Sequence, residues 1–484
     1  MAKTQNKAQK CGKKILFATS EAMPFIRTGG LGDVAGALPK SLNGLGYDCR
    51  VIMPLYGGIS GEFRQTMEFI GSTYVRLAWR NQYCGVFRSS YNGVTYYFID
   101  NEYYFKRGGL YGHFDDGERF AFFSKAVLES AQITGFYPDV IHSNDWQTAL
   151  IPVFLDVFYR GMDGYRDSRT VLTIHNIEFQ GQYDPFVIGD ILGIPSDWNP
   201  IMMWGEAANY LKGGIERANV VTTVSETYAE ELGNPFYSYG LGEIISQRRY
   251  KVKGVVNGID TELYNPETDE NLKTRYNVKT VAGKEENKKE LCELLDLPYA
   301  ENRAMIGIVS RLTEQKGLDL IAPVLDEMLA ADIQLVVLGT GDWKYETLLR
   351  NAENNYHNKV RAIINFNSGL AQKIYGGADL FLMPSKYEPC GLGQMIAMRY
   401  GTVPIVRETG GLKDTVEPFN PQTGKGTGFT FKTYHPYDML DAVWRALGIY
   451  FDKGLYKKVQ SNCMKSDFSW TASAKKYADI YNSL

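Results

Sequence analysis

The chain has 484 residues, of which 44% are hydrophobic and 22% are charged, a balance that excludes an intrinsically disordered protein. Lysine and arginine number 52 against 55 aspartate and glutamate, and the net charge of −3 argues against a nucleic-acid-binding protein. No apolar run reaches the roughly 18 residues of a membrane span, and the early stretch Ile15–Ala18 is too short for a signal peptide. We therefore expect a soluble cytoplasmic protein with no membrane partner.

Short apolar runs alternate with helical patterns through the first half of the chain. The expected strands are Lys13–Ser20, Cys49–Pro54, Asp139–Asn144, Arg169–His175 and Ala218–Ser225. A helix over Gly30–Leu45 separates the first two strands, and this alternation is typical of a parallel sheet covered by helices. The stretch Thr73–Asp100 differs, because three strand-like runs lie close together with short turns, which predicts an antiparallel addition.

The same rhythm restarts in the second half. Its expected strands are Ala304–Ser310, Ile333–Gly339, Val360–Phe366, Asp379–Pro384 and Val403–Glu408. The fold class is therefore α/β, with two doubly wound Rossmann-like domains. We place the boundary between residues 1–253 and 254–466. Ligands of such sheets bind beyond the carboxyl ends of the strands, so two facing sheets predict a site in the cleft between the domains.

A glycine-rich loop, Arg27–Asp33, opens the first helix. Gly30 begins a match to the dinucleotide fingerprint G-x-G-x-x-A. About ten residues separate the first strand from these glycines, and the second strand ends at Met53-Pro54 without the acid that would hold a ribose, so the match to NAD is weak. Free amides at a helix start beside Arg27 suit a phosphate group, whereas a tight packing turn would also explain the glycines.

Two cations, Arg311 and Lys316, follow the strand Ala304–Ser310. Arginine offers a bidentate fork and lysine a mobile point charge, which together suit a diphosphate. A solvated basic loop is the alternative.

The segment Ser385–Gly393 follows another strand and opens a helix over Leu392–Tyr400. Its Glu388 is placed to accept hydrogen bonds from sugar hydroxyls, and the following residues present free N–H groups. An acid that complements the helix dipole is the alternative for Glu388. A second glycine-rich helix start, Thr409–Leu412, follows the next strand.

Histidine and acidic residues end two strands of the first half. His175 ends one, and His142 and Asp145 end another. A histidine in such a place is often a packed core residue. No D-x-D or H-E-x-x-H motif occurs, and the six cysteines are irregularly spaced without a C-x-x-C pair, so we expect neither a metal nor another cofactor.

Taken together, the chain resembles the bacterial glycogen synthases and plant starch synthases, which are retaining glycosyltransferases of the GT-B fold that use ADP-glucose. The resemblance runs from about Lys13 to the C-terminus. It is carried by SEAMPFIRTGGLGDVAGALPKSL, NEYYF, HSNDWQTAL, TIHNIEFQG, VTTVSETYAEE, VVNGID, VSRLTEQKGLDLI and SKYEPCGLGQMIAMRYGTVPIVRETGGLKDTV. It also implies that residues 467–484 form a C-terminal helix that crosses back to the first domain.

The resemblance assigns roles to individual residues. Four residues would be catalytic. Glu388 would be the essential carboxylate, His175 would lie near the glucosyl ring, and Arg311 and Lys316 would be the cations that bind the diphosphate. The remaining positions would bind the substrates: Arg27, Gly29, Gly30, Asp33, Asp145, Asn257, Phe366, Cys390, Gly391, Leu392, Thr409 and Gly410. Phe366 would stack on adenine.

Two positions depart from the family. Arg27 stands where the family loop usually has lysine, and Ile396 stands where related transferases often carry a second glutamate.

The resemblance implies ADP-glucose as donor and an α-1,4-glucan such as glycogen as acceptor. The sequence by itself leaves an NAD oxidoreductase and a non-catalytic glucan- or nucleotide-sugar-binding protein as alternatives, and it sets no oligomeric state.

Overall fold

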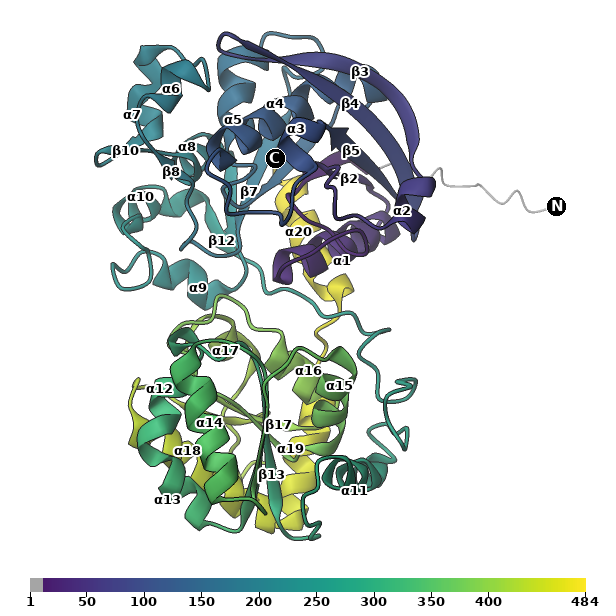
Figure 1. The fold of residues 1–484 in the computed structure, drawn as a ribbon, viewed down its shortest axis with the longest axis vertical. Helices are drawn as coiled ribbons and strands as arrows, with labels where there is room; N and C mark the ends of the chain where they lie inside the picture. Colours follow the sequence, from purple (N-terminus) through teal and green to yellow (C-terminus); the bar gives the residue numbers. More distant parts are fainter. Residues whose placement is uncertain (1–11) are drawn as a thin grey trace, which may run out of the picture. The chain divides into compact units, whose positions relative to one another are not determined.

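Two compact units make up the chain, and the computed structural model describes residues 12–484 (Figure 1). The first unit contains the chain up to Val224, Ala229–Val255 and Trp470–Leu484. The second contains Ser225–Tyr228 and Val256–Ser469. The chain thus leaves the first unit before the second sheet begins and returns to it for its last helix.

A nine-stranded sheet is the core of the first unit. Its strands lie in the order β12 (Val252–Gly254), β11 (Val220–Thr223), β7 (Arg169–Ile174), β6 (Val140–Asn144), β1 (Lys14–Ala18), β2 (Asp48–Pro54), β5 (Val94–Asp100), β4 (Arg80–Tyr91) and β3 (Glu68–Leu77). Neighbours from β12 to β5 run parallel, which confirms the expected parallel sheet. The apolar residues of β1 are at most 2% exposed, as helices on both faces of a parallel sheet require.

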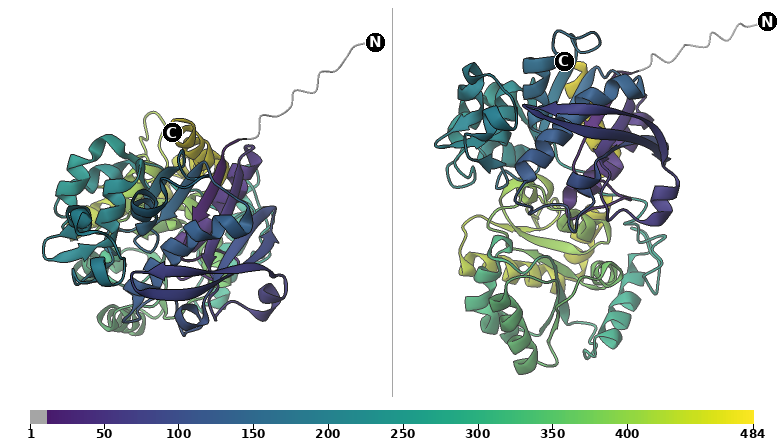
Figure 2. Two further views of the ribbon diagram at one scale, coloured as in Figure 1. Left: turned by 90° about the horizontal axis from the view of Figure 1, so that it is seen from above. Right: turned by 45° about the horizontal axis from the view of Figure 1, so that its top comes forward.

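The antiparallel addition is also present. Strand β4 pairs antiparallel with both β3 and β5, and these strands form one edge of the sheet (Figure 2). The addition begins at Glu68, five residues before the predicted start at Thr73. Strand β3 ends at Leu77, because Ala78 adopts a left-handed turn conformation with φ of 49°.

The helices of the first unit connect and cover these strands. They are α1 (Gly30–Gly44), α2 (Gly61–Gln65), α3 (Glu102–Phe105), α4 (Asp116–Thr134), α5 (Leu150–Phe154), α6 (Val187–Asp190), α7 (Asn199–Met202), α8 (Tyr210–Arg217), α10 (Gly242–Gln247) and α20 (Trp470–Asn482), while α9 (Glu226–Glu231) starts among the four residues that belong to the second unit. A small separate sheet contains β8 (Gln182–Tyr183), β10 (Ala207–Asn209) and β9 (Met203–Trp204).

The C-terminal helix α20 packs beside α1, so the yellow and purple ends of the chain lie together in Figure 1. The Tyr481 hydroxyl is 2.7 Å from Nδ1 of the fully buried His142. Lys13 Nζ donates to the Tyr481 carbonyl oxygen, also at 2.7 Å. These contacts tie the end of the chain into the first unit.

A six-stranded, fully parallel sheet is the core of the second unit. Its strands lie in the order β15 (Val360–Ile363), β14 (Ile333–Leu338), β13 (Ala304–Val309), β16 (Leu380–Met383), β17 (Val403–Arg407) and β18 (Phe429–Phe431). The five predicted strands are all present. Two details differ, because β15 ends three residues before Phe366 and the short edge strand β18 has no counterpart in the sequence prediction.

The helices of the second unit alternate with these strands. They are α11 (Lys284–Leu294), α12 (Leu318–Ile321), α13 (Leu325–Ala330), α14 (Trp343–Asn355), α15 (Ser368–Gly377), α16 (Gly393–Arg399), α17 (Gly410–Thr415), α18 (Pro436–Phe451) and α19 (Lys453–Lys465). Within residues 12–484, none of the helices has the length and apolar character needed to cross a lipid bilayer.

The strand order of each sheet contains one switch point, where successive connections turn in opposite directions. It lies between β1 and β6 in the first unit and between β13 and β16 in the second. Ligands of doubly wound sheets bind at the carboxyl ends of the two strands that flank such a point. The loops that follow β1, β6, β13 and β16 are therefore where functional side chains are expected.

Candidate active site

In the first unit, the loop after β1 is held by a buried carboxylate. Glu21 is 3% exposed, and its Oε2 accepts hydrogen bonds from the backbone N–H and the hydroxyl of Thr28. Burial raises the pKa of Glu21 above its usual value, against the lowering effect of these bonds. Glu21 was not predicted as a functional residue, although an acid three residues beyond a buried strand was the available signal.

Glycine is needed at different positions of this loop for different physical reasons. A Cβ on Gly32 would come within 2.5 Å of Arg27 Cβ, so Gly32 is required for packing. A Cβ on Gly29 or Gly30 would meet no atom within 4 Å. The backbone at the start of α1 is therefore open, as a phosphate site at a helix N-terminus requires. Arg27 forms an ion pair with Asp33 beside this opening.

After β6, Asp145 fixes the backbone at the end of β7. Its Oδ1 accepts from the backbone N–H of His175 at 2.7 Å, and Asp145 takes a left-handed conformation with φ of 55°, which aspartate tolerates. Burial raises the pKa of Asp145 to about 7. The structure thus brings together two residues that the sequence analysis placed in the site.

The imidazole of His175 is neutral. Its Nε2 lies 2.9 Å from Asn144 Oδ1, and the Asn144 amide nitrogen donates to the Ala18 carbonyl oxygen, so Nε2 carries the proton. Desolvation lowers the pKa of His175 to about 3. His175 therefore acts as a hydrogen-bonding group at neutral pH and not as a cation. His142 is a core residue, since both of its ring nitrogens are bonded, to Tyr481 and Thr173.

In the second unit, the loops after β13 and β16 meet at an ion pair. Lys316 Nζ lies 2.6 Å from Glu388 Oε2, and the two side chains are 16% and 8% exposed. Ser385 Oγ donates to the same carboxylate oxygen at 3.1 Å. Glu388 is thus fixed by a lysine and a hydroxyl rather than serving a helix dipole alone.

Arg311 is placed differently from Lys316. It is exposed, and its Nη2 donates to Gln315 Oε1 at 2.9 Å. Between residues 12 and 484, no carboxylate lies within ion-pair distance of Arg311. The two predicted diphosphate cations are therefore unequal, because one is neutralised by Glu388 and the other keeps its guanidinium fork for an external anion.

The two glycine-rich loops of the second unit pack against each other. A Cβ on Gly410 would come within 2.0 Å of the Glu388 carbonyl oxygen, and the Gly411 N–H donates to that oxygen at 3.1 Å. Gly391 and Gly410 both have positive φ, of 71° and 44°. Thr409 is fully buried behind them. Gly410 and Gly411 therefore hold the backbone of the Glu388 loop in place.

Asn257 lies against this loop. Its backbone N–H bonds the thiol of Cys390, whose pKa burial raises to about 12, so Cys390 is an unreactive packing residue. The Asn257 Oδ1 atom is buried and finds no hydrogen-bond partner in the described part of the chain. A buried, unsatisfied amide oxygen beside a functional loop is a candidate acceptor for a ligand hydroxyl. Leu392 is the N-cap of α16, and its side chain is half-buried.

Two exposed aromatic rings follow neighbouring strands of the second sheet. Phe366, three residues beyond β15, is 81% exposed, and Trp343, at the start of α14 after β14, is 79% exposed. Phe366 was predicted from the sequence, whereas Trp343 was not. Exposed aromatic rings at the carboxyl edge of a sheet suit stacking on a nucleobase.

The predicted residues fall into one group in each unit. The first unit holds Arg27, Gly29, Gly30, Asp33, Asp145 and His175, and the second holds Asn257, Arg311, Lys316, Phe366, Glu388, Cys390, Gly391, Leu392, Thr409 and Gly410. In each unit the group is centred on the loops that flank the switch point. Within the described residues, no three His, Cys, Asp or Glu side chains cluster as metal ligands would.

Comparison with known proteins also divides the chain into two parts, each matching a different family model. Residues 14–247 match the starch synthase catalytic domain, and residues 293–450 match the glycosyl transferases of group 1. The chain is 50% identical to the glycogen synthase of Clostridium acetobutylicum over 97% of this chain and 100% of that one. It is 48% identical to the glycogen synthase of Anoxybacillus flavithermus over 97% and 98% of the two chains.

A solved structure shares the whole fold. The catalytic domain of starch synthase IV from Arabidopsis thaliana, bound to ADP and acarbose, superposes with a TM-score of 0.89 at 34% identity over 98% of this chain and 99% of that one. The sucrose-phosphate synthase of Thermosynechococcus elongatus, at 16% identity and a TM-score of 0.60 over 97% and 98% of the chains, shares the fold alone.

Proposed function

This chain is a glycosyltransferase that belongs to the glycogen and starch synthase family, and we propose that it transfers glucose from ADP-glucose to the non-reducing end of an α-1,4-glucan with retention of configuration. The choice of glycogen as acceptor follows from the named relatives, and that of ADP as leaving group from the starch synthase bound to ADP. Membership of the family removes the NAD oxidoreductase alternative.

The observation that carries the proposal is the contact between Lys316 and Glu388 at the switch point of the second sheet. A mostly buried ion pair with one fixed carboxylate is expensive to assemble, and at a switch point it marks a ligand site rather than a stabilising contact. One of the three N–H groups of the Lys316 ammonium donates to Glu388 Oε2, so the other two remain available for a diphosphate oxygen.

We infer the roles of the residues from the charges that the reaction develops. When the bond from the anomeric carbon to the diphosphate oxygen breaks, positive charge grows on the sugar and negative charge on the departing diphosphate. Arg311 and Lys316 stabilise that negative charge, most strongly in the transition state. Glu388 orients the glucose and Lys316 together. The acceptor 4-hydroxyl adds on the face that the diphosphate leaves, and its proton passes to a diphosphate oxygen.

In the first unit, the groups proposed to contact the donor are uncharged. The open backbone at Gly29 and Gly30 offers N–H donors to phosphate oxygens. The neutral imidazole of His175 is a hydrogen-bonding group beside the glucosyl ring, where a second cation would oppose the developing positive charge. Asp145 keeps the His175 backbone in position.

We further propose that the transfer needs no metal ion or other cofactor, because Arg311 and Lys316 supply the positive charge that a divalent cation would otherwise bring to the diphosphate. EDTA should therefore leave turnover unchanged, and activity that is lost with EDTA and restored by Mg²⁺ or Mn²⁺ would refute this part. We place the reaction in the cytoplasm, where the five buried thiols Cys49, Cys84, Cys292, Cys390 and Cys463 remain reduced.

The proposal is tested by offering ADP-glucose and UDP-glucose in turn, each with glycogen, and measuring nucleoside diphosphate release. We expect release from ADP-glucose that depends on glycogen. Without any release from either donor, the alternative of a non-catalytic glucan-binding protein would replace the proposal.

A further inference from the structure

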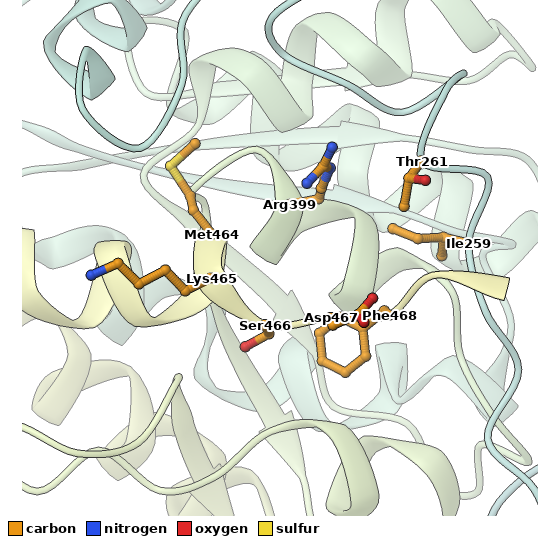
Figure 3. Close-up of a pocket in the computed structure, with 8 residues that line it drawn as sticks. All are labelled: Ile259, Thr261, Arg399, Met464, Lys465, Ser466, Asp467 and Phe468. Atoms are coloured by element: carbon orange, nitrogen blue, oxygen red, sulfur yellow. The ribbon is translucent and has the colours of Figure 1, made fainter. Parts of the chain in front are cut away.

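A separate cavity of about 200 Å³ opens in the second unit, where the C-terminal ends of α16 and α19 meet the two segments through which the chain enters and leaves that unit (Figure 3). The two segments are joined by the Ile259 N–H, which donates to the Phe468 carbonyl oxygen at 2.8 Å. The volume is several times the roughly 30 Å³ that one water occupies in the liquid. None of the residues assigned to the donor site lines this cavity.

Two cations line the cavity. Arg399 Nε donates to the Tyr264 carbonyl oxygen at 3.3 Å, and in the described part of the chain neither terminal guanidinium nitrogen has a hydrogen-bond partner. Lys465 is exposed and, over the same residues, has no carboxylate within 4 Å. Its ammonium points away from Arg399 in Figure 3. Arg399 therefore offers the directional donors, and Lys465 contributes mainly to the local positive potential.

The end of helix α16 does not explain Arg399, whereas Lys465 lies in the last turn of α19. A cation near the last turn of a helix complements the negative end of the helix dipole. At the end of α16, however, backbone N–H groups of the next turn already bond the last carbonyls, because Tyr400, Gly401 and Thr402 donate to residues 396–398. Arg399 bonds none of these carbonyls and lines the cavity instead.

The rest of the wall contains both polar and apolar side chains. Asp467 is the one acid among the lining residues, and its Oδ1 accepts from the Ser469 N–H at 2.9 Å, so that oxygen is engaged within its own turn. The side chains of Ile259, Met464 and Phe468 form the apolar part. The lining side chains therefore carry one net positive charge, with hydroxyls and an aromatic ring close by.

We propose that this cavity binds a small phosphorylated sugar, at a site distinct from the donor site. A guanidinium with free terminal nitrogens recognises phosphate through two parallel hydrogen bonds. The hydroxyls of Thr261 and Ser466 suit sugar hydroxyls, and the Phe468 ring suits the apolar face of a sugar. The size of the cavity favours a sugar phosphate over inorganic phosphate.

Calorimetry of the full chain with glucose 1-phosphate tests the proposal. Saturating ADP is present throughout, because the donor site also binds phosphate groups. Inorganic phosphate and glucose are titrated separately as probes of the two halves of the ligand. We expect saturable binding of glucose 1-phosphate and weaker binding of either half.

Variants connect that binding to the cavity. Arg399→Gln should weaken glucose 1-phosphate binding at least about tenfold, whereas Arg350→Gln, at an exposed arginine on α14, should not change it. Lys465→Glu should weaken binding at low salt more than Lys457→Glu, at another exposed position of the same helix.

Several results would overturn the proposal. The first is that glucose 1-phosphate does not bind when ADP is saturating. The others are an unchanged affinity of Arg399→Gln for glucose 1-phosphate, and equal losses of that affinity in the two lysine variants. Inorganic phosphate that bound as tightly as glucose 1-phosphate would show that the cavity does not recognise the sugar. Because no turnover is measured, failure here is independent of failure of the proposed transferase activity.

Discussion

Substitution of Glu388 by glutamine removes one charge from the centre of the proposed donor site and changes little else. Glu388 Oε2 lies 2.6 Å from Lys316 Nζ and accepts from Ser385 Oγ at 3.1 Å. A glutamine oxygen can accept both bonds. The substitution therefore isolates the charge of the carboxylate from its shape.

The structure sets the expected size of both effects. Leaving a buried ion without its partner costs about 3–5 kcal/mol, but the amide keeps a hydrogen bond to Lys316, so we expect a stability loss of about 1–3 kcal/mol. A folded domain with the usual margin of about 5 kcal/mol or more survives that loss at 25 °C. Turnover should fall at least about a hundredfold, equivalent to about 3 kcal/mol, because the carboxylate orients both glucose and Lys316.

The assay compares initial rates of ADP release with thermal unfolding of the same preparations. Glu314→Gln is the matched control, because Glu314 pairs with Lys386 at 2.8 Å between the same two loops and its side chain is 50% exposed. An exposed pair contributes at most about 1 kcal/mol, so this control should keep its turnover. A folded Glu388→Gln variant with near-normal turnover would refute the assigned role and return Glu388 to a helix-end acid.

Arg311→Ala should lower kcat by a larger factor than it weakens ADP affinity measured by calorimetry, because the leaving group gains charge in the transition state. A loss of ADP affinity with unchanged kcat would show that Arg311 only binds the donor in the ground state. Gly32→Ala should lower stability by about 1–3 kcal/mol in thermal unfolding because its Cβ would meet Arg27, whereas Gly29→Ala should leave stability unchanged and raise KM for ADP-glucose. The His175 ring signals should not titrate by NMR between pH 5 and 8, because desolvation lowers its pKa to about 3. Since the unfolded imidazole takes up a proton below about pH 6.5 and the folded one does not, His175 should make the protein less stable as the pH falls through 6.5, and His175→Asn should lessen that loss.

The strands of both sheets could be predicted because their residues are buried runs with clear ends. Ala304–Val309 is apolar along its length and Ile333–Leu338 has Gln334 as its one polar residue, and both runs lie between polar turns, as buried parallel strands should. Strand β18 has three residues, Phe429–Phe431, too few to show a period. Strand β15 ends before Phe366 because the chain turns there to reach Asn367, whose side chain caps α15.

The site could be predicted residue by residue but not in its contacts. Arg311, Lys316 and Glu388 each follow a strand, so their common edge was predictable from the rule for parallel sheets. That Glu388 meets the loop after β13 depends on β13 and β16 being neighbours, which sequence order does not reveal. That it pairs with Lys316 and not with Arg311 depends on the path of that loop, in which Arg311 instead donates to Gln315. Likewise, both histidines were expected at strand ends, but His142 is the central residue of β6, where its bond to the distant Tyr481 makes it structural.

Extension of an α-1,4-glucan from ADP-glucose with retention is tested by NMR of the product formed from ¹³C-labelled ADP-glucose and a short maltooligosaccharide. We expect one labelled glucose per ADP released, joined at the non-reducing end through an α-1,4 linkage. A β-linked product, or ADP release accompanied by free glucose and no longer glucan, would contradict it.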